Sequence, residues 1–215
     1  MEYSIEVFCD NSNNANTYLI YNEECCFVID PANNNKILSR YIGDKKLLGI
    51  LLTHGHYDHF SSLKKLLELF PTKVYMHKNT YAKLLNPNTS YAIAFGNPNP
   101  TVIDLVDVQF VKNDDVIALG EFAIKCWHTP GHTDCSMSYI LDNNLFSGDF
   151  IFKGSIGRCD LATANNIKMY NSLNELKKRK INYTIYPGHE SSTTLEEEKQ
   201  NNYYLINNSM NHLFN

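Results

Sequence analysis

The sequence predicts an α/β fold in which two β-sheets pack together and carry helices on their outer faces. Three observations point to it. Short β-type runs fall into two similar halves of the chain, each half also contains amphipathic helical segments, and their order is neither all-β nor a strict βαβ alternation. At 215 residues with 43% hydrophobic content, the chain has the size and composition of one globular domain, which we expect to span residues 1–215.

The first half begins with three short β runs, bounded by turn-forming residues at Asn11–Asn14 and Asn22–Glu24. Helical spacing predicts one helix that ends at Gly43 and another that Pro71 stops. The apolar run between these helices has no polar alternation, as expected of a strand covered on both faces. The predicted β runs are 3–8, 17–21, 25–30, 47–53 and 73–77, and the predicted helices are 34–43 and 60–70.

A loop rich in Asn and Pro, at 86–100, separates the halves. The second half is expected to open with the run "DVQFV" at 107–111 and to hold one long amphipathic helix at 165–180. Two of its strands surround the turn "DNN". The remaining predicted β runs are 114–119, 121–129, 136–141, 144–149 and 183–187.

Side chains of the metal-ligand type recur where these predicted strands end. A loop held by buried strands suits a site that needs accurate geometry. Each residue alone has a plainer explanation, since Asp149 could belong to a turn and His189 could cap a helix beginning near Ser191–Thr194. Their conjunction favours a metal site. The candidate ligands are His54, His56, Asp58, His59, His132, Asp149 and His189.

The spacing predicts two metal ions. Alternate residues of an extended segment point the same way, so His54 and His56 can bind one ion together, with His132 completing that set. Asp58 and His59 can turn toward a second ion, with His189. Asp149 has two oxygens and can bridge ions about 3.5–4 Å apart. A glycine lies beside each cluster, where we expect the backbone to need unusual dihedral angles: Gly55, Gly131, Gly148 and Gly188.

Composition excludes several classes of protein. A formal net charge of -4 argues against a nucleic-acid binder that relies on broad positive charge. No apolar run approaches the roughly 20 residues needed to span a bilayer, and the N-terminus has no signal-peptide pattern. We therefore expect a cytoplasmic protein. The six cysteines form no C-x-x-C motif and should be free thiols, with a redox-active Cys25–Cys26 pair as the alternative.

The motifs "THGHYDH", "TPGHT", "SGD" and "PGH", between residues 53 and 189, resemble the ordered motifs of the metallo-β-lactamase superfamily. This resemblance implies a four-layer αββα sandwich with the site along one edge of the sheets. The stretch "SGDFIFKGSIGRCDL", residues 147–161, is similar to the glyoxalase II-like group (hydroxyacylglutathione hydrolases), and "PGHESSTTLEEEKQNNYYL" resembles its short members. Asp149 stands where class B β-lactamases carry a cysteine ligand, so antibiotic hydrolysis is not expected.

Two features depart from that group. Only 26 residues follow His189, too few for the helical C-terminal domain that binds glutathione in classical members. Asp134 and Cys135 stand where many relatives have a second Pro-Gly or similar small pair. Cys135 is either a packing residue or a soft extra ligand.

The resemblance implies a metal-dependent hydrolase that cleaves a small-molecule thioester by attack of a metal-bridging hydroxide, with no nucleic-acid or membrane partner. His54, His56 and Asp58 are the expected catalytic residues. The expected cofactors are two divalent metal ions, zinc in the first place, with iron or manganese as alternatives. Lys153 and Arg158 are candidate substrate contacts, or else partners in salt bridges within the protein. Three further histidines are expected to be structural: His77, His128 and His212.

Three other functions fit parts of the sequence. A persulfide dioxygenase would hold a single Fe(II) with His54, His132 and Asp149, and the stretch from Gly157 to Asp160 resembles the "GR-x-D" pattern of those enzymes. A nuclease of the superfamily would share the "HxHxDH" motif, although it usually has a basic surface. A binding protein without activity would keep buried histidines and carboxylates at a cost in stability.

Overall fold

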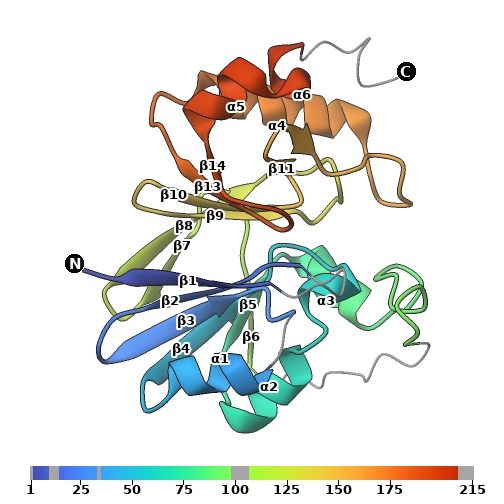
Figure 1. Ribbon diagram of the computed structural model, residues 1–215. Helices are drawn as coiled ribbons and strands as arrows, with labels where there is room; N and C mark the ends of the chain where they lie inside the picture. Colours follow the sequence, from blue (N-terminus) through green and yellow to red (C-terminus); the bar gives the residue numbers. More distant parts are fainter. Residues whose placement is uncertain (1, 10–14, 33–34, 98–106, 208–215) are drawn as a thin grey trace. The chain divides into compact units, whose positions relative to one another are not determined.

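The computed structural model describes residues 2–9, 15–32, 35–97 and 107–207. The chain divides into two compact units, and its main strands form two six-stranded sheets (Figure 1). The first sheet lies in unit 1, and the second lies mostly in unit 2. Unit 1 comprises residues 1–111 and 117–123, and unit 2 comprises residues 112–116 and 124–215.

The sheet of unit 1 has six strands in chain order. Strands β1 to β3 are antiparallel neighbours, whereas β3, β4, β5 and β6 run parallel to one another. Since parallel strands end at the same edge of a sheet, the loops that leave β3 and β4 begin side by side. The strands are β1 (Ser4–Phe8), β2 (Thr17–Tyr21), β3 (Cys25–Ile29), β4 (Lys46–Leu51), β5 (Val74–Met76) and β6 (Val108–Phe110).

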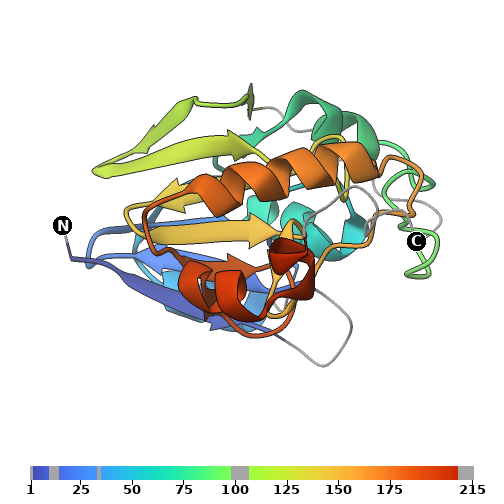
Figure 2. The same ribbon diagram turned by 90° about the horizontal axis from the view of Figure 1, so that it is seen from above.

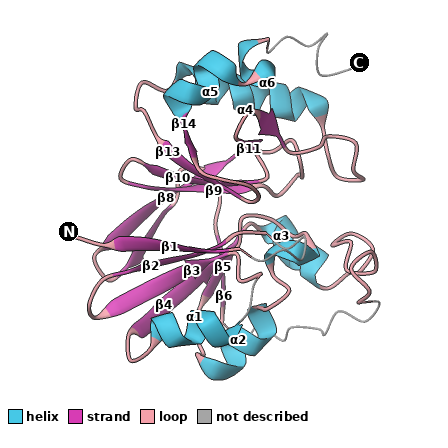
Figure 3. Ribbon diagram, in the orientation of Figure 1, coloured by secondary structure: helices cyan, strands magenta, loops and turns pink. Residues whose placement is uncertain are grey.

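One face of this sheet is covered by helices (Figure 3). Helices α1 (Asn35–Ile42) and α2 (Leu63–Leu69) insert buried aliphatic side chains such as Leu38 and Leu66 into the same cluster as Val28 and Ile50 of the sheet. Unit 1 also contains the one-turn helix η1 (Tyr57–His59) and helix α3 (Lys78–Leu84). The rings of Phe122 and Phe27 meet with centroids 5.2 Å apart, so the short segment 117–123 also packs on this sheet.

The second sheet has the order β14-β13-β10-β9-β8-β7. Its pair β10 and β13 is parallel, whereas β8 with β9, β9 with β10, and β13 with β14 are antiparallel. A separate two-stranded hairpin, β11–β12, follows β10. The strands are β7 (Val116–Leu119), β8 (Phe122–His128), β9 (Met137–Leu141), β10 (Asn144–Gly148), β11 (Ile151–Phe152), β12 (Ser155–Ile156), β13 (Thr184–Pro187) and β14 (Thr193–Thr194).

Three helices cover the second sheet: α4 (Asn166–Lys178), α5 (Leu195–Asn201) and α6 (Tyr203–Ile206) (Figure 2). Their buried side chains, among them Met169, Leu195 and Leu205, share one cluster with Trp127 and Ile185 of the strands. Burial of these apolar surfaces is the main force that fixes the helices on the sheet.

The predicted fold class is confirmed, because the structure is mixed α/β with two sheets and helices packed on them. One expectation was wrong. The run at 107–111 does not open the second half, since β6 pairs in parallel with β5 of the first sheet. A three-residue strand carries no local signal of the sheet that it joins. The expectation of a single domain over 1–215 stays a prediction.

The alternative role of His189 as a helix cap was also wrong. Helix α5 begins at Leu195 with Thr194 as its N-cap, whose side chain accepts a hydrogen bond from the Glu197 amide. Among the described residues, no helix combines the length and apolar character needed to cross a bilayer.

Candidate metal centre

The loop that leaves β4 buries four polar side chains, which we call the unit 1 ligand set: His54, His56, Asp58 and His59. All four belong to buried residues, and His59 is fully inaccessible. The ring centroid of His54 lies 4.6 Å from that of His56 and 4.1 Å from that of His59. His56 is extended, and the turn of η1 that follows it redirects Asp58 and His59. The loop therefore gathers three imidazoles and a carboxylate.

Asp30, which ends the run "CCFVID", orients two of these imidazoles. Its Oδ2 lies 2.8 Å from His59 Nδ1, and it accepts a 2.6 Å bond from the Thr53 hydroxyl. That hydroxyl lies 3.1 Å from His54 Nδ1. Since the hydroxyl proton goes to Asp30, the hydroxyl oxygen accepts from His54 Nδ1–H. Both imidazoles therefore carry their proton on Nδ1 and present Nε2 as the ligand atom.

The sequence reasoning missed Asp30, although a signal existed. It follows a buried strand, as the recognised candidates do, and β3 is the parallel neighbour of β4. Its φ of 50° lies in the left-handed region, which Asp tolerates better than most residues. The Thr53 amide donates to Asp30 Oδ1 at 2.8 Å and fixes the other carboxylate oxygen.

The second group of candidates, the unit 2 ligand set, consists of His132, Asp149 and His189. Asp149 Oδ2 lies 3.4 Å from His132 Nε2 and 3.7 Å from His189 Nε2. His132 and Asp149 are buried, whereas the His189 side chain is 31% exposed. Asp149 and His189 follow the parallel pair β10 and β13, whose ends are joined by a 2.9 Å bond from Gly188 N to Gly148 O. The pairing of these strands thus brings the two side chains together.

His132 has its own orienting partner. Its Nδ1 lies 2.9 Å from the carbonyl oxygen of Arg158, so Nδ1–H donates there and Nε2 faces Asp149. Gly157, just before, packs so closely on the Asp149 carbonyl that a β-carbon would overlap it. A β-carbon on Gly131 would lie 2.6 Å from Met169 Cα of α4. Close packing explains both glycines, and of those expected to need unusual dihedrals only Gly148 has a φ, 51°, well inside the left-handed region.

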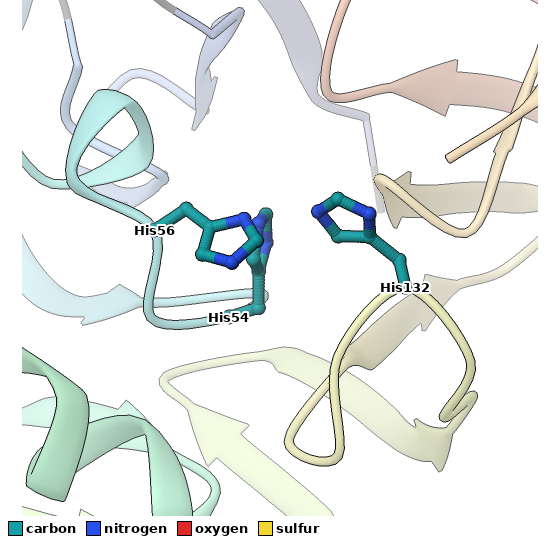
Figure 4. A group of neighbouring side chains, drawn as sticks. All are labelled: His54, His56 and His132. Atoms are coloured by element: carbon teal, nitrogen blue, oxygen red, sulfur yellow. The ribbon is translucent and has the colours of Figure 1, made fainter. Parts of the chain in front are cut away.

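The residues present fit a metal centre. Three groups of three side chains among the described residues could each hold an ion: His54 with His56 and His132, His54 with His59 and Asp149, and Asp58 with His59 and His189. Figure 4 draws His54 and His56, which come from the loop after β4, and His132, which comes from the loop after β8. Imidazole nitrogens with carboxylate oxygens are ligands that zinc, iron and manganese accept.

Both candidate substrate contacts are engaged in ion pairs. Arg158 Nε and Nη2 each lie 2.7 Å from an Asp160 carboxylate oxygen, and both side chains are more than 60% exposed. The Arg158 guanidinium holds the pKa of Asp160 at about 2. Lys153 Nζ lies 3.4 Å from Glu197. A role in substrate binding stays a prediction for both.

The cysteines are free thiols. Burial raises the pKa of Cys26 and Cys126 to about 12 and that of Cys159 to about 11. Cys135 is fully buried, with its sulfur 3.3 Å from the Thr133 hydroxyl, and belongs to none of the three possible metal groups. These contacts match its reading as a packing residue.

The histidines outside the two ligand sets make structural contacts where they are described. His77 caps α3, with Nδ1 accepting from the Asn79 amide, and His128 Nε2 lies 3.0 Å from the Asp134 carbonyl. His212 lies outside the described residues.

The sequence matches one family model, the metallo-beta-lactamase superfamily, over residues 11–189. It is 32% identical over 165 residues to the probable metallo-hydrolase YqgX of Bacillus subtilis, an alignment that covers 75% of this chain and 77% of that protein. It is 30% identical over 188 residues to a hydroxyacylglutathione hydrolase of Francisella tularensis subsp. novicida, covering 85% of this chain and 66% of that protein.

The fold is also that of solved structures. The crystal structure of BLEG-1 B3 metallo-beta-lactamase matches 95% of this chain and 99% of its own, with a TM-score of 0.83 and 27% identity. That of TTHA1623 in a di-iron-bound form matches 93% and 99%, with a TM-score of 0.80 and 27% identity. ETHE1 from Myxococcus xanthus matches 98% and 88%, with a TM-score of 0.77, and its 24% identity supports the fold alone.

Proposed function

Because this chain belongs to the metallo-beta-lactamase superfamily, we propose that it is a metal-dependent hydrolase that cleaves the thioester of a small molecule. The observation that carries the proposal is the pair of ligand sets, in which three imidazoles are each held in one tautomer: His54 by Thr53, His59 by Asp30 and His132 by the Arg158 carbonyl. Residues with no metal to bind would have little need of such orientation.

His54, His56 and His132 would hold one divalent cation, and Asp58, His59 and His189 a second, with Asp149 as the bridge. These two trios are also two of the three groups of side chains that lie close enough together to hold an ion. When bound, such cations lower the pKa of water toward neutrality and polarise a carbonyl group. Zinc is the proposed metal, with iron as the first alternative because one solved relative holds two irons.

The protein's own residues would prepare the site in three ways. Asp30 and Thr53 keep the proton on Nδ1 of His54 and His59, and the Arg158 carbonyl keeps it on Nδ1 of His132. Burial of the ligand side chains limits the access of bulk water, which strengthens electrostatic interactions there. Arg158, exposed on its loop, could exchange Asp160 for a carboxylate of the substrate's thiol carrier.

A thioester is the substrate class that these features favour. A thiolate is a good leaving group and needs little protonation, so a dedicated general acid is not required. The hydroxyacylglutathione hydrolase relative has this type of substrate, although glutathione itself is not assigned to this chain. We further propose a cytoplasmic location, where reduced thiols persist, and no nucleic-acid partner, given the net charge of -4.

The test is metal analysis of the purified protein together with an assay on S-D-lactoylglutathione and simpler thioesters. We expect two equivalents of metal and thioester cleavage that a chelator abolishes. A metal-replete protein that leaves every thioester intact would show the assignment to be wrong. A chromogenic cephalosporin belongs in the same assay, because the relative BLEG-1 is a B3 metallo-beta-lactamase although Asp149 argues against that activity here.

A persulfide dioxygenase remains the alternative, with His54, His132 and Asp149 around one Fe(II). Against it stands the position of Asp58 and His59, which are buried and, in the case of His59, bonded to Asp30. One equivalent of iron, and oxygen uptake with glutathione persulfide, would decide for the dioxygenase.

A further inference from the structure

We propose that Glu198 of α5 and Asn202, which caps α6, are positioning residues for the unit 2 ligand set. They bind the β11–β12 hairpin, which connects Asp149 to the carbonyl that orients His132. This inference rests on the proposed function, because it gives the pair a part in metal binding.

Glu198 is a buried acid, and each of its two carboxylate oxygens accepts hydrogen bonds. It is 1% exposed. Its Oε2 accepts from the Gly154 amide at 2.9 Å and from Asn202 Nδ2 at 2.7 Å, and its Oε1 accepts from the Thr193 hydroxyl at 2.7 Å. A buried carboxylate is costly unless it is well hydrogen-bonded. Here one of the donors is the turn of the β11–β12 hairpin.

Asn202 links the C-terminal segment 193–206, which we call the tail, to the same hairpin from a second direction. It is fully buried, and its Oδ1 accepts from the amides of Tyr204 and Leu205 at the start of α6. Its Nδ2 donates to the Ser155 carbonyl at 2.9 Å as well as to Glu198. The amide group thus serves the helix with one atom and the hairpin with the other.

The hairpin stands directly between two parts of the ligand set. Strand β11 begins at Ile151, two residues after Asp149, and β12 ends at Ile156, two residues before Arg158. The Arg158 carbonyl bonds to His132 Nδ1, and Gly157 packs on the Asp149 carbonyl. A shift of the hairpin would therefore move a metal ligand and the partner of another.

A purely structural role would be the attachment of the tail to unit 2. Apolar contacts already supply that attachment, since Leu195 of α5 and Leu205 of α6 are buried in the cluster that includes Leu173 of α4. The bond from the Gly154 amide to Glu198 is additional to these apolar contacts and is directed at the hairpin turn. The two roles differ in what they predict for metal binding.

The experiment is a Co(II) titration of the full-length apoprotein, followed by the visible absorption of the bound ion and by competition with a chelator. In Glu198→Gln the side chain keeps its volume. Its NH2 group, however, is itself a donor and would face one of the groups that donate a hydrogen bond to Glu198. We expect this variant to bind at least one Co(II) about 10-fold more weakly, with an altered spectrum. Glu196→Gln, on the exposed side of the same helix, should match the wild type in both.

Asn202→Ser is the second variant, because serine retains the cap of α6 but cannot reach the Ser155 carbonyl. It should weaken Co(II) binding in the same direction. Wild-type affinity and spectrum in both folded variants would overturn the proposal, even if their melting temperatures fall, because the pair would then only stabilise the tail. A wild-type protein that binds no Co(II) would instead remove the proposed function, and this inference with it.

Discussion

At the scale of single residues, Asp30 connects two imidazoles of the unit 1 ligand set, His59 directly and His54 through the Thr53 hydroxyl. The motif "HxHxDH" contains candidate ligands but not the acid that fixes the tautomers of two of them. That acid lies 23 residues or more away in the chain, so no local pattern pairs it with them. Its position at a strand end is the one feature that a sequence reading could have used.

Asp30→Asn should weaken metal binding by about 10–100-fold, the range for loss of a partner of a metal ligand. Asparagine tolerates the left-handed backbone, but it replaces an acceptor oxygen by a donor. A chelator-competition titration measures the effect. Asp142→Asn is the matched control, because Asp142 also has a positive φ, 52°, and is exposed in the β9–β10 turn. Equal affinities for both variants would contradict the role of Asp30.

His56→Ala should abolish thioester turnover and leave the far-UV circular dichroism unchanged, since His56 lies in the loop between β4 and η1 and its side chain makes no capping hydrogen bond to η1. His77→Ala serves as the control. It removes the α3 cap, at a cost of about 1 kcal/mol, and should retain activity. Full activity in His56→Ala would show that His56 is not a catalytic residue.

Cys159 should resist alkylation at neutral pH. Burial raises its thiol pKa to about 11, so at pH 8 only about one molecule in a thousand carries the reactive thiolate. Because the shift is upward, the rate should rise about tenfold per pH unit until the pKa is approached. Iodoacetamide labelling followed by mass spectrometry measures it, with the exposed Cys9 as the fast reference. A pH-independent rate would mean that the thiol is not protected in this way.

At the scale of elements, the β runs of three or more residues and helices α1, α2 and α4 were predictable, whereas the two-residue strands and helix α3 were not. The run 47–53 is continuously apolar, as a strand covered on both faces should be, and 165–180 has the apolar period of a helix. Strands β11, β12 and β14 have two residues each, too few for any period. Helix α3 begins after His77, a residue outside the usual N-cap group, so it gave no start signal.

Gly157→Ala should disrupt the unit 2 ligand set more than the fold. A β-carbon there would overlap the Asp149 carbonyl and lie 3.0 Å from His132 Cγ, so the backbone must shift at both ligands. We expect metal binding and turnover to fall together, measured by titration and assay. Gly43→Ala offers a control, because its nearest atom would be 3.5 Å away and only its φ of 54° is unfavourable. That variant should lose stability of about 1–2 kcal/mol and keep its metal affinity.

At the scale of the whole molecule, most of the candidate site was predictable because its ligand-type residues follow the ends of predicted strands. Of the seven candidate ligands, six are buried and the seventh, His189, lies beside Asp149. Their orienting partners were harder to foresee, because the Arg158 carbonyl is a backbone group with no side-chain signature. Glu198 was also hard to foresee, because it accepts a hydrogen bond from a hairpin turn 44 residues away in the sequence.

The expected single domain predicts one cooperative unfolding transition. Trp127 is the only tryptophan and belongs to unit 2, so its fluorescence follows that unit, whereas far-UV circular dichroism follows both. In a urea titration the two midpoints should coincide. Separate midpoints would show that the units unfold independently and that the chain holds two domains.

The carboxylate of Asp30, which serves two rings, would couple the binding of the two proposed metal ions. His54 belongs to the ligands proposed for one ion and His59 to those proposed for the other, yet a single acid serves both rings. Asp30 Oδ2 lies 2.8 Å from His59 Nδ1 and reaches His54 through the Thr53 hydroxyl, by bonds of 2.6 and 3.1 Å. An ion bound through one of these rings would restrain, through that acid, the ring proposed for the second ion. Loading should be cooperative, so preparations short of metal would be mixtures of empty and doubly filled molecules.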